Sequence, residues 1–209
     1  ILARLLAGES CALVTDAGTP AISDPGEDLV RLCAENGVEV LSIPGCCAAV
    51  NALAVSGLPT GRFTFEGFLT VNKKSRRAHL DSLRSEERTM IFHEAPHKLR
   101  TTLEDLCAAF GPERRISLCR ELTKLHEETM RCTLGEAAAY YEAHDPKGEY
   151  VLVVAGAEKR EEAAVTLEDG VSQVRALVEG GMRLKDAAKE VSAHTGLSKN
   201  ELYAAALER

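Results

Sequence analysis

The sequence predicts an α/β fold that ends in a small helical region. Short apolar runs alternate with segments of helical periodicity over residues 11–157, which is typical of helices packed on a sheet. Loops rich in Gly and Pro follow the first two apolar runs. From residue 171 onward the periodicity is helical alone. These three observations predict two α/β domains and a helical tail.

The first domain is predicted over residues 1–59, as the later part of a parallel α/β layer. Residues 1–8 read as the end of a helix that stops at Gly8. We therefore expect the chain to begin inside a larger protein, or the N-terminal part of this domain to be missing. Apolar runs and helical spacing predict buried strands over residues 11–15 and 38–43 and helices over residues 27–36 and 46–55.

The second domain is predicted over residues 60–157 and has a mixed sheet. Its predicted strands cover residues 63–69, 89–93, 115–120 and 149–155, and its predicted helices cover residues 79–84, 99–110 and 133–142, with a loop or turn over residues 121–128. Residues 158–170 are acidic and predict a linker. The tail, residues 171–209, predicts three short helices over residues 171–179, 184–193 and 198–207, arranged like a helix-turn-helix unit.

The composition excludes several classes of protein. Apolar residues make up 45% of the 209 residues and charged residues 27%, which is typical of a globular protein with a real core. No apolar run approaches the roughly 18–20 residues that a membrane helix needs. The 25 Lys and Arg against 32 Asp and Glu give a net charge of −7, so the whole chain is not a basic coat for nucleic acid.

Cofactor and metal motifs are also informative. No Gly-x-Gly-x-x-Gly follows a predicted strand and no Gly-Lys-Ser/Thr occurs, which argues against dinucleotide and nucleoside triphosphate chemistry. The seven Cys have no metal-type spacing, and we expect free thiols in a reducing cytoplasm and no metal.

The two loops of the first domain are the first candidates for a ligand site. Residues 16–26 and 44–48 follow the two predicted strands, and ligands of parallel α/β folds bind beyond the carboxyl ends of strands. In residues 16–26 Gly and Pro allow the backbone to approach a ligand closely, while Asp, Thr and Ser offer hydrogen bonds. From composition alone, an ordinary connecting loop is about as good an interpretation.

Seven stretches of the chain, in order, resemble one bacterial family, the ribosomal RNA small-subunit methyltransferases I of the tetrapyrrole methylase superfamily. They are LVTDAGTPAISDPG at residues 13–26, IPG at 43–45, FTFEGFL at 63–69, FHEAPHKL at 92–99, RELTKLHEE at 120–128, GEYVLVV at 148–154, and LKDAAK with LSKNELY between 184 and 203. The DAGTP sequence stands where the porphyrin and corrin enzymes of the superfamily have a Gly-Asp-Pro type, which favours the RNA branch.

The resemblance implies a fold, a cofactor and a reaction. It implies two α/β domains with S-adenosylmethionine (SAM) held in the cleft between them, a small C-terminal helical domain and a homodimer. The implied reaction is 2′-O-methylation of a cytidine in 16S ribosomal RNA. The cofactor-binding residues that it implies are Asp16, Gly18, Thr19, Ile22 and Ser23 in the first loop, Pro44, Gly45 and Ala48 in the second, and His93, Glu94, Ala95, Pro96 and Gly148 in the second domain.

The candidates for catalysis follow from the chemistry of a ribose hydroxyl. The hydroxyl is a weak acid, so a base or a nearby cation that favours the alkoxide would assist methyl transfer. Glu94, Glu121 and Lys124 are the candidates, with His126 a further one. For each of them alone, a solvated salt-bridge cluster is the more common role. His93 and His97 have no third metal ligand in pattern, which again predicts no metal.

A local basic stretch offers a surface for RNA. Residues 62–100 contain nine Lys or Arg and five Asp or Glu, a net charge of +4 within a chain of −7. Its densest part consists of Lys73, Lys74, Arg76 and Arg77, and such a cluster can hold phosphates. In an arbitrary protein such a basic cluster is more often a solvated loop than a binding surface. The resemblance to an RNA-modifying family makes the binding surface the preferred interpretation here. The helical tail is interpreted equally well as an RNA contact or as a packing module.

Two other functions remain open from the sequence. One is C-methylation of a tetrapyrrole such as a corrin or porphyrin, which would need a closed pocket lined by apolar and basic groups. The other is a non-enzymatic RNA-binding or assembly module. Stabilisation of the folded protein by SAM but not by ATP would separate the methyltransferases from this module.

Overall fold

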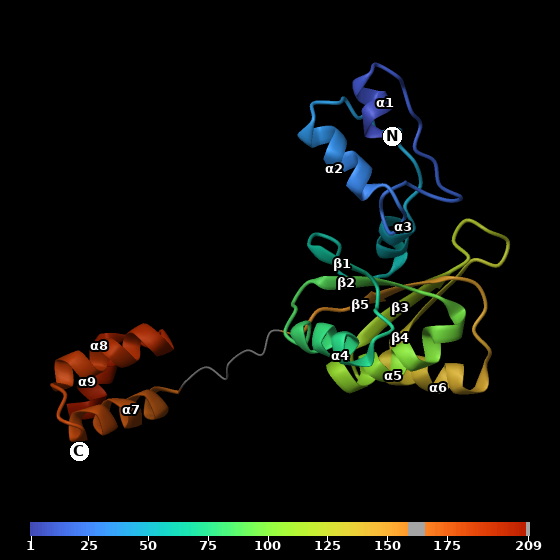
Figure 1. Cartoon of the computed structure of the whole chain (residues 1–209). Helices are drawn as coiled ribbons and strands as arrows, with labels where there is room; N and C mark the ends of the chain where they lie inside the picture. Colours follow the sequence, from blue (N-terminus) through green and yellow to red (C-terminus); the bar gives the residue numbers. More distant parts are fainter. Residues whose placement is uncertain (159–165, 208–209) are drawn as a thin grey trace. The chain divides into compact units, whose positions relative to one another are not determined.

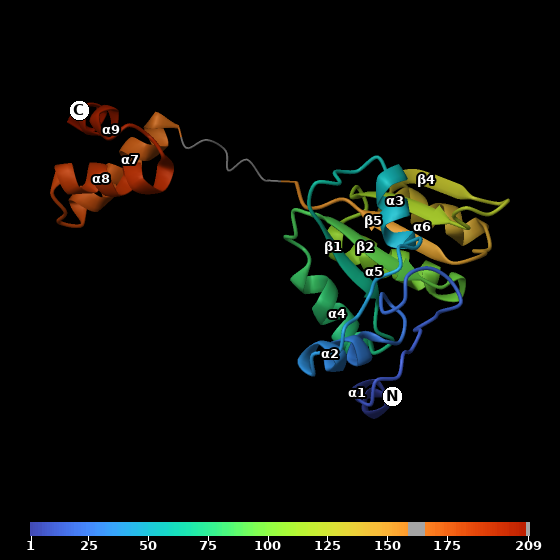
Figure 2. The same ribbon diagram turned by 90° about the horizontal axis from the view of Figure 1, so that it is seen from above.

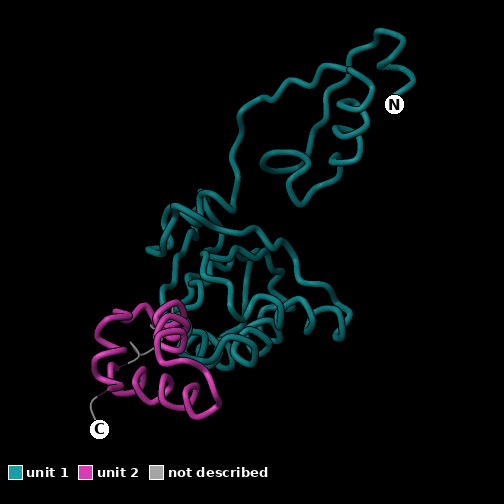
Figure 3. Tube along the Cα trace, turned by 90° about the vertical axis from the view of Figure 1, so that its left-hand side faces the viewer, with its two compact units in different colours: residues 1–158 teal, residues 159–209 magenta. Residues whose placement is uncertain are grey.

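The computed structural model describes residues 1–158 and 166–207, and it divides the chain into two compact units. Unit 1 comprises residues 1–158 and unit 2 residues 159–209 (Figure 3). Each unit is described by itself. The expected boundary between two α/β domains near residue 59 stays a prediction, and residues 159–165 of the expected linker lie outside the described residues, as do the last two residues of the tail.

Unit 1 is built on one five-stranded mixed sheet (Figure 1). The strands are β1 (Phe63–Phe68), β2 (Thr89–Glu94), β3 (Arg115–Arg120), β4 (Glu128–Thr133) and β5 (Tyr150–Val154), in the order β1-β2-β5-β3-β4. β1 and β2 are parallel, and the other three pairs of neighbours are antiparallel. The four strands expected in this region are present, and β4 is a fifth that the sequence analysis missed. Its side chains are half-buried with no clear alternation, so the apolar signal of a strand is weak.

Alternate side chains of each strand point to opposite faces of the sheet, and different helices pack on the two faces. Met90 and Phe92 of β2 are fully buried on the face covered by α4 (Lys73–Ser82), α5 (Leu99–Phe110) and α6 (Leu134–Ala143). Ile91 is fully buried on the other face, beneath α3 (Ala48–Val55). Figures 1 and 2 show α3 on one face of the sheet and α4, α5 and α6 on the other.

The basic residues after β1 form a helix that begins earlier than predicted. The sequence analysis expected a helix from residue 79, whereas α4 begins at Lys73. Asn72 caps it, because its side chain accepts a hydrogen bond of 3.1 Å from the backbone N–H of Ser75. The long side chains of Lys and Arg favour a helix nearly as well as Ala does, which a reading of apolar periodicity alone overlooks.

An arginine of the sheet fixes the end of α3. Nε of Arg131, on β4, donates a hydrogen bond of 3.1 Å to the carbonyl oxygen of Val55, the last residue of the helix. The carbonyl groups at a helix C-terminus have no partner within the helix, so a cation there is favourable. This contact holds α3 on the sheet and thereby positions residues 44–47, which lead into its first turn.

The two strands predicted for the first domain are wrong. Residues 11–15 and 38–43 form no strand, although the helices expected around them are present as α1 (Leu2–Leu6), α2 (Glu27–Glu35) and α3. Most apolar side chains of both segments are exposed, with Val14 and Ile43 each 81% accessible. A strand requires a neighbouring strand to which it is hydrogen-bonded, and within the described residues neither segment has one. Apolar composition predicts burial, but it does not show whether such a neighbouring strand exists.

Unit 2 is a bundle of three helices, α7 (Leu167–Glu179), α8 (Leu184–Thr195) and α9 (Lys199–Leu207). Its core contains Val174, Ala188 and Leu202, all fully buried. α8 ends at Gly196, whose left-handed backbone (φ 74°) allows the sharp turn into α9. The three expected helices are thus present, and the first begins four residues earlier than predicted. None of the helices in the described part of the chain is both long and apolar enough to cross a bilayer.

Gly156 tests the packing between the segment that follows β5 and the segment that precedes β2. A Cβ at this position would lie 2.0 Å from the carbonyl oxygen of Glu87, which is part of the backbone and cannot turn aside. We expect Gly156→Ala to lower the free energy of unfolding by at least about 1–3 kcal/mol, as overpacking does. Gly61→Ala is the matched control, because nothing lies within 4 Å of its Cβ position, and it should change stability by less than about 0.5 kcal/mol. Urea unfolding curves of equal midpoint for both variants would contradict this packing.

Candidate active site at one end of the sheet

The strand register brings residues from distant parts of the sequence to one end of the sheet. Glu94, the last residue of β2, pairs with Tyr150, the first of β5. Tyr150 also pairs with Arg120, the last residue of β3. The segments that follow β2 and β3 and precede β5 therefore emerge side by side. These segments contain the predicted residues Ala95, Pro96, Glu121, Lys124 and Gly148.

The two loops predicted to bind the cofactor contact one another. Thr19 Oγ1 donates a hydrogen bond of 3.1 Å to the carbonyl oxygen of Cys46. Gly18 has φ +81°, and a Cβ there would lie only 3.3 Å from the same carbonyl oxygen. Gly45 lies on the other side of this contact, with its Cβ position 3.5 Å from Thr19 Oγ1. Both glycines thus allow the two loops to approach closely.

The first loop also reaches the end of the sheet. The Cβ position of Gly67, on β1, lies 4.0 Å from the hydroxyl oxygen of Ser23. Ala21 and Ser23 both have positive φ, 64° and 62°, which is uncommon for residues other than Gly. Such backbone conformations persist where the surrounding structure enforces them, and they gather at functional sites.

His93 is the titratable group at the centre of this arrangement. Burial lowers the pKa of its imidazole, and the nearby carboxylates of Glu149 and Asp24 oppose that shift without cancelling it. The pKa therefore stays below its usual value of about 6.5, and the ring is neutral at pH 7. Its Nε2 is buried and has no hydrogen-bond partner within the described residues. Asp24, which sequence reasoning missed, belongs to the first loop and is one of the two carboxylates that act on His93.

Glu94 is buried in a hydrogen-bonded chain and does not face the site. Its carboxylate accepts a short hydrogen bond from the hydroxyl of Thr102 and one of 2.9 Å from the backbone N–H of Ala95. Nη2 of Arg76 donates to the same Thr102 hydroxyl at 2.7 Å, and its Nε pairs with Asp105 at 2.5 Å. Glu94, Thr102 and Arg76 are all buried. These hydrogen bonds join the turn at Ala95 to α4 and α5.

Glu121 and Lys124 lie together beside Gly148. Lys124 Nζ donates a hydrogen bond of 3.0 Å to Glu121 Oε1, and the two side chains are 64% and 23% exposed respectively. A Cβ on Gly148 would lie 2.6 Å from Glu121 Oε1, so this glycine leaves room for the carboxylate. An acid–cation pair open to solvent at the end of the sheet can exchange protons with a bound substrate.

The predicted basic patch divides into a buried and an exposed part. Arg76 points inward to Thr102 and Asp105, which removes it from the surface. Lys73, Lys74 and Arg77 are exposed on α4, and Arg77 retains 83% of its accessible side chain. The separation follows from helical geometry, because neighbouring positions of a helix point in directions about 100° apart. We call these three exposed cations the α4 patch.

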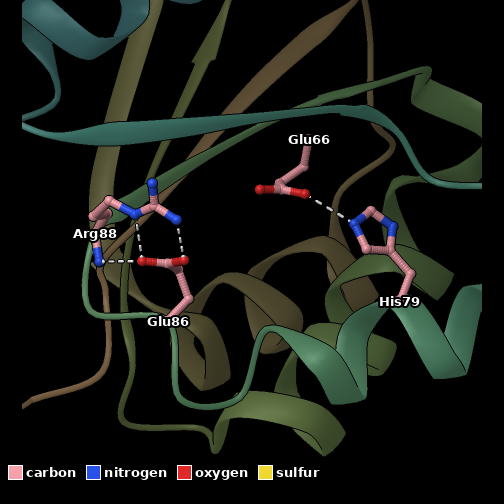
Figure 4. A network of polar contacts seen from close by, with 4 residues as sticks. All are labelled: Glu66, His79, Glu86 and Arg88. Atoms are coloured by element: carbon pink, nitrogen blue, oxygen red, sulfur yellow. Dashed lines mark hydrogen bonds and ion pairs between the residues drawn. The ribbon is translucent and has the colours of Figure 1, made fainter.

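The opposite end of β1 and β2 carries a different polar surface (Figure 4). A hollow there is lined by Arg62, Ser82, Ser85, Glu86, Glu87 and Arg88. Arg88 donates three hydrogen bonds of 2.6–2.8 Å to the Glu86 carboxylate. These bonds lower the pKa of Glu86 to about 2. Glu66 and His79 pair nearby at 2.8 Å. These carboxylates already have partners, and the hollow lies at the amino ends of parallel strands, where ligands of such folds rarely bind.

Comparisons with known proteins define the class. Residues 1–138 match the family model described as Tetrapyrrole (Corrin/Porphyrin) Methylases, and residues 165–209 match the model described as RsmI C-terminal HTH domain. The fold is similar to that of the crystal structure of the methyltransferase CobJ, with a TM-score of 0.55 and 22% identity over 75% of this chain and 68% of that one. The chain is therefore a methyltransferase of the tetrapyrrole methylase fold, as the sequence predicts.

The relatives define the branch within that class. Ribosomal RNA small subunit methyltransferase I of Synechocystis sp. is 46% identical over 208 residues, which is 100% of this chain and 75% of that protein. The protein of the same name from Escherichia coli O157:H7 is 43% identical over 211 residues, or 100% of this chain and 73% of that protein. The chain belongs to the ribosomal RNA small subunit methyltransferase I family, which confirms the resemblance drawn from its motifs.

Replacing Thr102 tests the buried chain of hydrogen bonds. Thr102→Val keeps the shape of the side chain but removes the hydroxyl that joins Glu94 to Arg76. Because both charged groups then lose a partner in the interior, we expect a loss of about 1–3 kcal/mol in the free energy of unfolding. Thr101→Val, at the neighbouring exposed position of α5, is the control and should change stability by less than about 0.5 kcal/mol. Denaturant unfolding would refute the assignment if the two variants were equally stable.

Proposed function

We propose that this chain transfers a methyl group from SAM to the ribose 2′-hydroxyl of a cytidine in the 16S RNA of the small ribosomal subunit. The observation that carries the proposal is the approach of residues 16–26 to the end of the sheet, where Ser23 lies beside Gly67 and Asp24 acts on His93. Membership of the family supports the reaction, and the α4 patch supports a polyanionic substrate. A corrin or porphyrin substrate has no comparable support.

The residues present fit a donor of this chemistry. The donor carries a positively charged sulfonium, and it supplies an electrophilic methyl group for in-line displacement. Asp24 and Glu149, whose charges both act at His93, give the site a negative potential that favours such a cation. Residues that would hold the donor are Asp16, Gly18, Thr19, Ile22 and Ser23 in the first loop, Pro44, Gly45 and Ala48 in the second, and His93, Ala95, Pro96 and Gly148 at the end of the sheet.

The remaining steps, which are proton removal and alignment of the acceptor hydroxyl, fall to side chains of the protein. The acceptor hydroxyl must lose its proton as the new C–O bond forms. Glu121 is the candidate to receive that proton, and the charge of Lys124 favours the alkoxide oxygen. Glu94 acts through the turn at Ala95, which it positions. Holding the hydroxyl in line with the methyl group and excluding water supplies much of the rate in such a transfer.

A homodimer and a cytoplasmic location complete the proposal. The exposed apolar side chains of Val14, Leu41 and Ile43, each at least 75% accessible, support an association that covers them. A substrate that is part of the ribosome supports the cytoplasm. Analytical ultracentrifugation of the purified chain would give the oligomeric state directly, and a single monomeric species at micromolar concentration would remove the dimer from the proposal.

The reaction is tested by transfer of labelled methyl from SAM to small ribosomal subunits from cells that lack this enzyme. We expect label in the RNA, in an alkali-stable and nuclease-resistant dinucleotide that contains 2′-O-methylcytidine. Naked 16S RNA serves as a parallel substrate and shows whether the assembled subunit is required. If SAM binds normally but no label enters RNA, a small-molecule acceptor is the better assignment. If SAM does not bind, a non-enzymatic RNA-binding module is the better one.

Removal of the α4 patch tests the contact with RNA. The triple variant, in which Lys73, Lys74 and Arg77 are changed to Ala, should bind RNA more weakly. The slope of log Kd against log salt should fall by about 2, because each lost phosphate contact removes about 0.7 from it. The affinity for SAM should not change. Arg31→Ala is the control, since that exposed arginine of α2 is already paired with Asp28 and Glu35. An unaltered salt slope in the triple variant would show that the patch is only solvated.

A further inference from the structure

An aromatic surface lies exposed at the candidate active site. Phe65 and Phe68, on β1, are 40% and 55% exposed, although large aromatic side chains are usually covered. Both rings contact His93 edge to face, with centroids 5.2 and 5.4 Å from the imidazole and interplanar angles of 77°. β1 is the edge strand of the sheet, so no further strand of the described residues covers this side. We call Phe65, Phe68 and His93 the aromatic platform.

The platform lies where an acceptor base must lie. Phe68 pairs with His93 in the register of β1 and β2, and Gly67 between the two phenylalanines lies beside Ser23 of the first loop. In a nucleotide the base is attached to the ribose carbon next to the one that bears the 2′-hydroxyl. A 2′-hydroxyl presented to a donor in the first loop therefore brings its own base to this end of β1.

The positive charge of α4, the helix that follows β1, also favours a nucleotide as the ligand. β1 ends at Phe68, and α4 begins five residues later with Lys73 and Lys74 exposed. Cations beside aromatic rings are the combination that binds single-stranded nucleic acid, because phosphates meet the cations while bases stack on the rings. The sequence contains only nine Phe and Tyr, and their spacing alone gave no sign that two would share an exposed surface with the α4 patch nearby.

His93 packs against both rings and is itself largely enclosed. Its buried Nε2 has no hydrogen-bond partner within the described residues, which is an unfavourable state for a buried polar atom. Because Nε2 is enclosed, a base stacked on the phenylalanines does not reach it, and the imidazole serves the platform by supporting the two rings that it contacts. Because burial keeps the pKa of His93 low, the ring is neutral at pH 7 and offers one donor and one acceptor nitrogen.

We propose that Phe65, Phe68 and His93 form a docking platform for the unpaired acceptor base of the RNA, on which the base stacks while its ribose is methylated. This inference rests on the proposed function and adds to it the means by which one nucleotide is selected and oriented. It requires that the acceptor be unstacked from its RNA neighbours, as enzymes that act on a nucleotide within a structured nucleic acid require.

The test compares substitutions of Phe68 in the full chain. Phe68→Leu keeps an apolar side chain but removes the aromatic face, whereas Phe68→Tyr keeps that face. Phe63→Leu is the matched control, since Phe63 has a similar exposure of 41% but lies at the opposite end of β1. The cytidines of an RNA fragment from the small subunit are replaced one at a time by a fluorescent cytosine analogue whose emission falls when it stacks. The position that the unaltered protein quenches is then compared with the cytidine that it methylates.

The expected result is specific to stacking. Phe68→Leu should raise the KM for small subunits by roughly 5- to 100-fold and abolish the quenching of the analogue, because a base–aromatic stack contributes that much to binding. Phe68→Tyr and Phe63→Leu should behave like the unaltered protein. S-adenosylhomocysteine, measured by calorimetry, should bind all four proteins equally. Equal melting temperatures would show that the fold is unchanged.

Three outcomes would overturn the platform. Unchanged KM and quenching in Phe68→Leu would show that the base binds elsewhere. Weaker binding of S-adenosylhomocysteine would show that the rings take the adenine of the donor. If Phe68→Leu lost self-association but bound RNA normally, a second copy of the chain would be the molecule that covers the two rings. Methyl transfer by the unaltered protein is recorded in parallel: if it fails while the Phe68 contrast in quenching persists, the proposed reaction is wrong and the platform stands.

Discussion

The pairing of β5 between β2 and β3 is the constraint on which the site depends. Tyr150 is in register with Glu94 on one side and with Arg120 on the other. This alignment places the chain leaving β2, the chain leaving β3 and the chain entering β5 at a single end of the sheet. Because side chains alternate along a strand, a slip of one residue would turn His93 toward α5 and bring Glu94 to the side that the first loop approaches. The fully buried strand residues Phe92 and Leu152 oppose such a slip.

The charges of unit 1 are segregated in a way that suits two unlike ligands. Asp24 and Glu149 act on His93 at the end of the sheet, which favours a cationic donor. Lys73, Lys74 and Arg77 lie on the solvent side of α4, which favours a polyanion. The buried hydrogen bonds from Arg76 through Thr102 to Glu94 join the helix that carries the patch to the turn beside the proposed donor site. The proposed RNA surface and the proposed donor site are thus joined through buried hydrogen bonds, although their charges have opposite signs.

Much of this architecture could be predicted from residue patterns. α5 follows from apolar spacing between Leu99 and Phe110, and β5 from five apolar or aromatic residues in succession. The two candidate loops were chosen because Gly and Pro follow apolar runs, and their role in binding stays a prediction. The prediction of strands at residues 11–15 and 38–43 was wrong, because composition cannot show whether a pairing strand exists. β4 was missed because its half-buried side chains lack alternation.

The environments of individual side chains were harder to predict than the helices and strands that carry them. Arg76 and Arg77 are adjacent in the sequence, yet one is buried against Thr102 and the other is exposed; only the packing of α4 on α5 decides between them. Glu94 was a candidate because its carboxylate could act as a base, but that carboxylate is buried and accepts hydrogen bonds from Thr102 and Ala95. The exposure of Phe65 and Phe68 depends on β1 being the edge of the sheet, which no local pattern reveals.

The central claim is that the donor binds where residues 16–26 meet the carboxyl ends of β1 and β2. Hydrogen exchange of the backbone amides, with and without saturating S-adenosylhomocysteine, tests it most directly. The account predicts slower exchange in residues 16–26, 44–48 and 93–96. It predicts no change around residues 82–88, at the other end of the sheet. Protection confined to residues 82–88, or uniform protection of the sheet without the loops, would contradict it.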